Sequence, residues 1–157
     1  MKNINAEIMH PEELATALHI YLADNIVLAL KAYNYHWNVT GEGFKGLHTI
    51  FQEVYEDAQE VIDIVGERIR ALDYKVHATM ADFLQVKTLE EGDSEATSEE
   101  MILDLESDHN KMSEFAGDLA ILATEYKDDA TLTIMGERRI IHEKFAWLLK
   151  SSLNIKE

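Results

Sequence analysis

Residues 44–72, FKGLHTIFQEVYEDAQEVIDIVGERIRAL, decide the fold because one helical periodicity runs through all of them. Apolar residues recur every three or four positions, which places them on one face of a helix: Leu47, Phe51, Val54, Ala58, Val61, Val65, Ile69 and Leu72. A second stripe with the same spacing is mostly polar: His48, Gln52, Tyr55, Gln59, Asp63 and Glu67. The stretch therefore predicts a long helix that buries one face and carries a polar seam beside it.

A second long helix is predicted just before this one. It opens at Pro11, which suits the first position of a helix because the N–H that proline lacks would be unpaired there, and runs to about Asn38. Its buried stripe contains two polar residues: Leu14, Leu18, Leu22, Asn25, Ala29, Ala32 and His36. The short segment from Val39 to Gly43 should turn the chain, so the two helices should pack antiparallel.

The second half of the chain predicts two more helices after a long connection. Residues 73–96 break the periodicity, with a short helix expected over residues 79–84, and their length suits a crossover between helices that point the same way. Thr97 and Glu100 form a capping-box pattern for a helix that reaches about Glu125. A last helix, capped by Asp129, should cover residues 130–153, with its apolar face on Leu132, Met135, Ile140, Ile141, Phe145, Leu148 and Leu149. The fold predicted is all-α, a ferritin-like four-helix bundle with a long crossover.

Composition narrows the function further. The 157 residues carry 14 Lys and Arg, 30 Asp and Glu, a net charge of −16 and no Cys. We expect one domain over residues 1–157 with a short N-terminal arm, residues 1–10. Disulfides and thiol chemistry are excluded, so a metal would have to bind His and carboxylates. No signal-like or membrane-spanning stretch is expected, which favours a cytoplasmic protein, and the acidic balance disfavours DNA binding.

A metal site can be derived from His36, His48, Asp63 and Glu67. His48 and Asp63 of one chain cannot bind the same metal ion, because fifteen residues of helix separate them by about 22 Å. An antiparallel copy of the same helix across a two-fold axis can, since facing residues then have numbers with a constant sum. The pairs His48–Glu67 and Gln52–Asp63 both sum to 115. His36 joins from the neighbouring helix, and this mixture of imidazole and carboxylate suits iron or manganese.

Each of these residues also has a simpler structural interpretation. Asp63 and Glu67 taken alone would be a solvated acidic face, and a lone histidine on an apolar stripe is usually a hydrogen-bonded core residue. Glu106 and His109 form half of an intrasubunit di-iron motif, but no second Glu-x-x-His lies in the predicted helices. The remaining histidines are therefore expected at the surface or in loops: His10, His19, His77, His109 and His142. Met80, Met101, Met112 and Met135 are expected to fill the core.

Several motifs closely resemble the Dps proteins, the miniature ferritins named for DNA binding in starved cells. They are Tyr35-His36-Trp37-Asn38-Val39-Thr40-Gly41, Leu47-His48, Asp63-Ile64-Val65-Gly66-Glu67-Arg68, Lys127-Asp128-Asp129 and Lys144-Phe145-Ala146-Trp147. The resemblance implies a homo-oligomer, a hollow dodecamer in which Fe2+ is oxidised, preferably by hydrogen peroxide, and stored as Fe3+ mineral. It also implies that His36 and His48 of one subunit and Asp63 and Glu67 of the other bind iron.

Two positions depart from the family pattern. Gln52 stands where the family usually has Asp, which removes one negative charge from the second iron position. Thr133 stands where an Asp often lies near the three-fold pores, which leaves Asp128 and Asp129 as alternative cation-attracting residues.

The resemblance leaves two alternatives open. Because of Gln52, the protein is either an active ferroxidase or a non-catalytic shell that sequesters metal. Trp37, beside His36, is either an electron donor that quenches stray oxidising equivalents or a packing residue at the dimer contact. The basic tail that DNA-binding family members commonly use is not expected, since Lys2 and Lys156 are the only permanent cations at the two ends.

Overall fold

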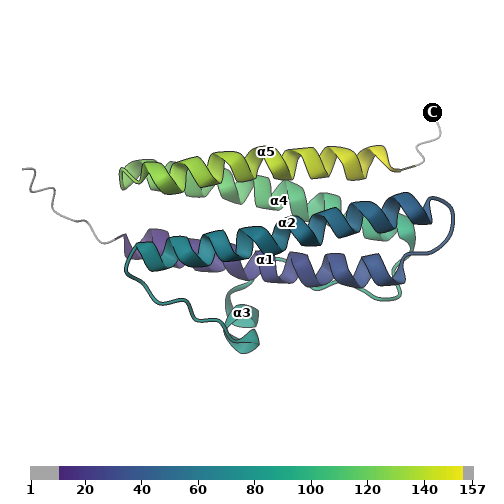
Figure 1. The fold of residues 1–157 in the computed structure, drawn as a ribbon, viewed down its shortest axis with the longest axis horizontal. Coiled ribbons are helices and arrows are strands. Elements are labelled where there is room, and N and C mark those ends of the chain that lie inside the picture. Colours follow the sequence, from purple (N-terminus) through teal and green to yellow (C-terminus); the bar gives the residue numbers. More distant parts are fainter. Residues whose placement is uncertain (1–10, 154–157) are drawn as a thin grey trace, which may run out of the picture.

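The structure, a computed structural model, describes residues 11–153, and its regular elements are all helices. Four long helices form the bundle, and a short fifth one lies on the crossover (Figure 1): α1 (Glu12–Asn38), α2 (Phe44–Ala71), α3 (Met80–Val86), α4 (Ser98–Glu125) and α5 (Asp129–Ser151). This confirms the predicted all-α, four-helix architecture. The predicted arm, residues 1–10, lies outside the described residues.

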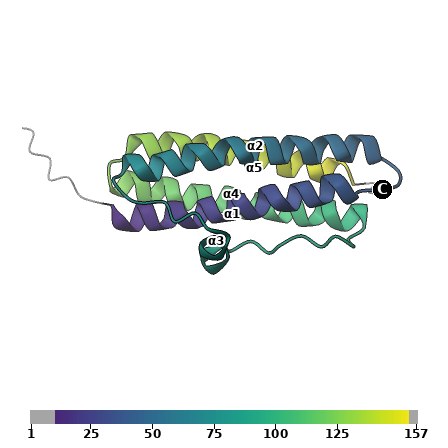
Figure 2. The same ribbon diagram turned by 60° about the horizontal axis from the view of Figure 1, so that its bottom comes forward.

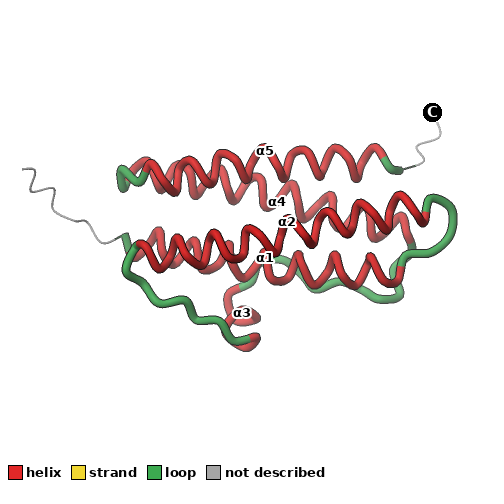
Figure 3. Tube along the Cα trace, in the orientation of Figure 1, coloured by secondary structure: helices red, strands yellow, loops and turns green. Residues whose placement is uncertain are grey.

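The bundle is built from two helix hairpins. α1 packs along α2, and α4 packs along α5, with α1 also contacting α4. The crossover carries the chain back along the outside of α1, where α3 sits, so that α2 and α4 run in the same direction (Figure 2). A short loop joins α1 to α2, whereas the connection from α2 to α4 runs along much of the bundle (Figure 3). The crossover predicted from its length is therefore confirmed.

Helix boundaries follow the sequence signals with small shifts. The capping box at Thr97 and Glu100 is present, and a second one, formed by Thr79 and Asp82, starts α3. Pro11 caps α1 from outside and is not its first helical residue. The cap of α5 is Asp128, not Asp129, because the Asp128 carboxylate accepts the Thr131 N–H at 3.0 Å.

The core confirms the stripes predicted for the first two helices. Every member of the α1 stripe is buried, including Asn25 and His36, and every member of the α2 stripe except the half-buried Leu72. The α5 stripe was partly wrong, since Ile140 is 68% exposed, and Met80 is 67% exposed where a core position was expected. The buried face of α5 instead consists of Thr131, Met135, Arg138, His142, Ala146 and Leu149.

A buried polar network explains why the α5 face was misassigned. His109 and His142 were expected near the surface, yet both are fully buried and their Nδ1 atoms lie 2.9 Å apart. The other side of His142 contacts the Tyr21 hydroxyl at 2.9 Å, and Arg138 holds Asp57 with two hydrogen bonds, one at 2.8 Å. Both ring nitrogens of His142 have partners, which lowers the cost of burying it, whereas Nε2 of the buried His109 has no partner among residues 11–153.

Two sets of polar contacts attach the crossover and α4 to α1. The carboxylate of Asp24 accepts the N–H groups of Thr88 and Leu89 at 2.6 and 3.0 Å. Lys31, buried in the bundle, lies 3.0 Å from Asp104 and 2.7 Å from Asp108. These contacts hold the middle of α1 against the crossover and α4.

One window of α1 is apolar and long enough to pass a length-and-composition test for a membrane span. Most of that window, 61%, is buried inside the bundle. The core helix of a packed bundle passes the same test, so this window does not favour membrane insertion.

Candidate metal centre

The structure brings His36 and His48 together at one end of the bundle. His36 lies in the last turn of α1 and His48 in the second turn of α2, and their rings stack with centroids 3.6 Å apart. The loop between them turns tightly through Gly41 and Gly43, whose φ angles of 91° and 80° favour glycine.

Each of these histidines donates a hydrogen bond to the backbone of the other. The Nδ1–H of His36 donates to the carbonyl of His48, and the Nδ1–H of His48 donates to the carbonyl of His36, both at 2.7 Å. A carbonyl oxygen only accepts, so Nδ1 carries the proton in both rings. In a neutral ring this leaves Nε2 with its lone pair free, which is the form that binds a metal.

Aromatic rings line the histidine pair. Tyr55 meets His36 edge-on at 5.3 Å, and Phe44 stacks on His48 at 5.2 Å. Tyr33 stacks on Tyr55 at 3.9 Å and touches Trp37 at 5.2 Å. Trp37 is 67% exposed and is connected to His36 through the two tyrosines.

Gln52 lies one turn after His48 and is half-buried. Its Nε2 donates to Oε1 of Glu56 at 2.7 Å. Glu56 was not among the predicted residues, although its place one turn beyond Gln52 on the polar side of α2 was a usable signal.

Asp63 and Glu67 lie one turn apart and exposed on α2, far from the histidine pair of the same chain. They border a shallow groove of about 640 Å³, which is also lined by Ile62, Gly66, Arg70 and Phe83. Over residues 11–153 neither carboxylate is in an ion pair, and no three His, Asp or Glu side chains converge in one chain. The structure thus joins the two histidines and leaves the acids apart, so the shared site stays a prediction.

The residues suggested for cation attraction behave differently from one another. Asp128 is engaged by Arg68, with both carboxylate oxygens 2.9 Å from Nη2, and by Thr131. Burial opposes ionisation of Asp128, but the bonds from Thr131 and Arg68 outweigh it and keep its pKa below the usual value. Asp129 is exposed, and Thr133 bonds the Asp129 carbonyl at 2.8 Å. The Asp128 carboxylate is thus occupied by Arg68 and Thr131, whereas neither of these residues bonds the Asp129 carboxylate.

Comparison with known proteins decides the family. A model of the ferritin-like domain matches residues 15–156. General stress protein 20U of Bacillus subtilis is 32% identical over 90% of this chain and 98% of its own length. DNA protection during starvation protein 2 of Bacillus anthracis is 31% identical over 91% of this chain and 98% of its own. The chain belongs to the Dps family.

Solved Dps structures share the fold. The Dps of Thermosynechococcus elongatus superposes with a TM-score of 0.90, at 29% identity and 94% coverage of both chains. The Dps of Vibrio cholerae, described as a member of a broad superfamily of ferritin-like diiron-carboxylate proteins, superposes with a TM-score of 0.86 at 28% identity, covering 90% of this chain and 89% of its own. Membership of the Dps family supports a general role in iron storage and protection.

Proposed function

We propose that this Dps protein oxidises Fe2+ to Fe3+, preferably with hydrogen peroxide, at sites shared between two subunits. The ferric product would be stored as mineral inside a dodecameric, cytoplasmic shell. The observation that carries the proposal is the His36–His48 pair, in which two backbone carbonyls fix both rings with Nε2 free.

The acidic half of the site would come from the partner subunit. In the proposed two-fold dimer, Asp63 and Glu67 of one chain face Gln52 and His48 of the other. The overall step consumes two Fe2+, one hydrogen peroxide and two protons, and yields two Fe3+ and two water molecules. Carboxylates favour this step because they stabilise the more highly charged product, while the imidazoles orient the substrate ion.

The test is rapid-mixing kinetics on the intact oligomer. Wild-type protein loaded with Fe2+ without oxygen should develop ferric absorbance rapidly on addition of peroxide, without precipitate. His36→Ala and Asp63→Ala should each slow this phase by about 100-fold or more, since loss of a residue that only orients a metal ligand already costs about 10- to 100-fold. Solution mass must stay unchanged in both variants. Equal rates in the wild type and both variants would refute the proposal.

Gln52 supports a second candidate, a shell that sequesters metal without redox turnover. A neutral amide lacks the negative charge that the usual Asp provides at this place. Gln52→Asp separates the two functions: a catalytically impaired site should gain oxidation rate by tenfold or more, whereas an already active site should change little.

DNA is not proposed as a partner. Each subunit carries a net charge of −16, which should repel phosphate. Purified protein should therefore leave duplex DNA unshifted in a gel at physiological salt, and a salt-dependent shift would contradict this.

A further inference from the structure

The hydrogen bond between Gln52 and Glu56 has a consequence for the metal site. A carboxylate only accepts hydrogen bonds, so the amide end of Gln52 that faces Glu56 must be its NH2 group. The other end, Oε1, is then the acceptor end of the amide, and no residue in 11–153 donates to it. Without Glu56 the amide could turn and present hydrogen atoms, which repel a cation, in place of an oxygen that attracts one.

Glu56 also restores the charge that Gln52 removes. It is exposed, and over residues 11–153 it is in no ion pair. By contrast the adjacent Asp57 is neutralised by Arg138. The pair Gln52–Glu56 therefore carries one uncompensated negative charge, as a single Asp at position 52 would, but placed one turn further from His48.

We infer that Glu56 is a positioning residue for the second metal position: it turns the Gln52 oxygen toward the site and supplies the missing charge. This inference rests on the proposed function, because it assumes that metal binds between the histidine pair and the partner's acids. It explains how a chain with Gln52 can keep two metal positions.

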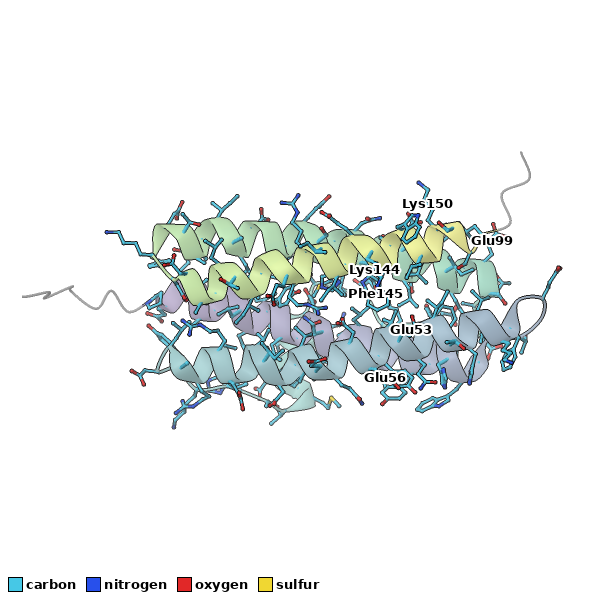
Figure 4. All side chains as sticks on the ribbon, turned by 45° about the horizontal axis from the view of Figure 1, so that its top comes forward. Glu53, Glu56, Glu99, Lys144, Phe145 and Lys150 are labelled. Carbon is cyan, nitrogen blue, oxygen red and sulfur yellow. The ribbon has the colours of Figure 1, made fainter. Side chains whose placement is uncertain are left out.

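Glu53 provides a matched control for Glu56. Both are exposed glutamates on α2, three residues apart (Figure 4), but Glu53 has no hydrogen bond to Gln52. Figure 4 shows Glu53 on the side of α2 nearer to α5. A general effect of removing one negative charge should therefore appear equally in Glu53→Gln and Glu56→Gln.

The experiment is a titration of the intact oligomer with Co2+. Calorimetry and the visible absorption of the bound ion both monitor the binding. The wild type should bind two Co2+ per site, one more weakly. Glu56→Gln should weaken only the second by about tenfold or more and change its spectrum, as loss of a residue that orients a ligand does. Glu53→Gln should match the wild type. In Gln52→Asp the added Glu56→Gln change should have less than a twofold effect, since the new carboxylate needs no such orientation.

The outcomes separate this inference from the proposed function. Unchanged binding in Glu56→Gln, or an equal loss in Glu53→Gln, would overturn the role of Glu56 while leaving the shared site intact. If His36→Ala retains both Co2+ ions, the shared site itself is wrong, and the inference fails with it.

Discussion

His36 and His48 hold each other by two equivalent hydrogen bonds, each from a ring Nδ1–H to the other residue's backbone carbonyl at 2.7 Å. This relationship joins the end of α1 to the start of α2 and needs no metal to form. The pair is therefore preorganised: its orientation is set by folding, and metal binding does not have to order either ring.

Trp37 should be the preferred site of oxidative damage. When Fe2+ and excess peroxide react, peptide mass spectrometry should find oxygen added to Trp37 at least five times more often than to Trp147. The two indoles are almost equally exposed, 67% and 64%, so a preference would reflect the aromatic contacts that join Trp37 to His36. Equal oxidation of the two residues would favour the packing role for Trp37.

The variant Trp37→Phe also distinguishes electron donation by Trp37 from packing at the dimer contact. If Trp37 donates electrons, the variant should oxidise Fe2+ at a rate within about twofold of wild type but accumulate damage on other residues. If Trp37 only packs at the dimer contact, the variant should dissociate more easily, and the products of oxidation should stay the same.

The buried histidine pair should make the bundle sensitive to acid. Burial, assisted by Arg138, lowers the pKa of His109 to about 3, and burial also lowers the pKa of His142. An unfolded histidine titrates near 6.5. Below that pH the unfolded chain binds more protons, so the contribution of this pair to stability is complete above about pH 6.5 and is lost as the pH falls toward 3.

Urea unfolding at pH 7.5 and pH 5.0 measures this effect. His109→Leu should be less stable than wild type at pH 7.5, because the Nδ1 of His142 loses its partner. Its stability should nevertheless fall less between the two pH values. His77→Ala, at an exposed position, should keep the wild-type pH dependence. An equal loss of stability on acidification in His109→Leu and wild type would contradict the assignment.

Lys31 should be a key residue for stability. Its ammonium group is buried between Asp104 and Asp108, so Lys31→Met would leave the buried Asp108 carboxylate with only the more distant Lys111, at 3.9 Å, as a cation beside it. The expected loss is about 3–5 kcal/mol in the free energy of unfolding. Adding Asp108→Leu should recover much of that loss, which a double-mutant denaturation series can measure. No recovery would mean that Lys31 acts through packing alone.

The sequence predicted the parts of the fold that depend on periodicity. The α1 and α2 stripes and the Thr97 capping box follow from spacing and residue type alone. The α5 face did not, because Arg138 and His142 are polar residues whose partners, Asp57, Tyr21 and His109, come from other helices. Local periodicity cannot show that such groups will satisfy one another in the core.

The candidate site, like the fold, was predictable only where its contacts follow from helix spacing. The contact between His36 and His48 follows from two antiparallel helices joined by a short loop. The contact between Gln52 and Glu56 was missed, although the spacing of one helical turn between them was a usable signal, because many exposed glutamates lie on this acidic helix. The approach of Asp63 and Glu67 to the histidines depends on a second subunit, so it remains a prediction.

Subunit mixing tests that central prediction most directly. His36→Ala and Asp63→Ala subunits, each inactive alone, would be dissociated, mixed in equal amounts and reassembled. In a dimer containing one of each, one site carries both defects and the other carries none. Random pairing should therefore restore about one quarter of the wild-type rate of Fe2+ oxidation by peroxide. A mixed assembly as inactive as its two components would contradict a site shared between subunits.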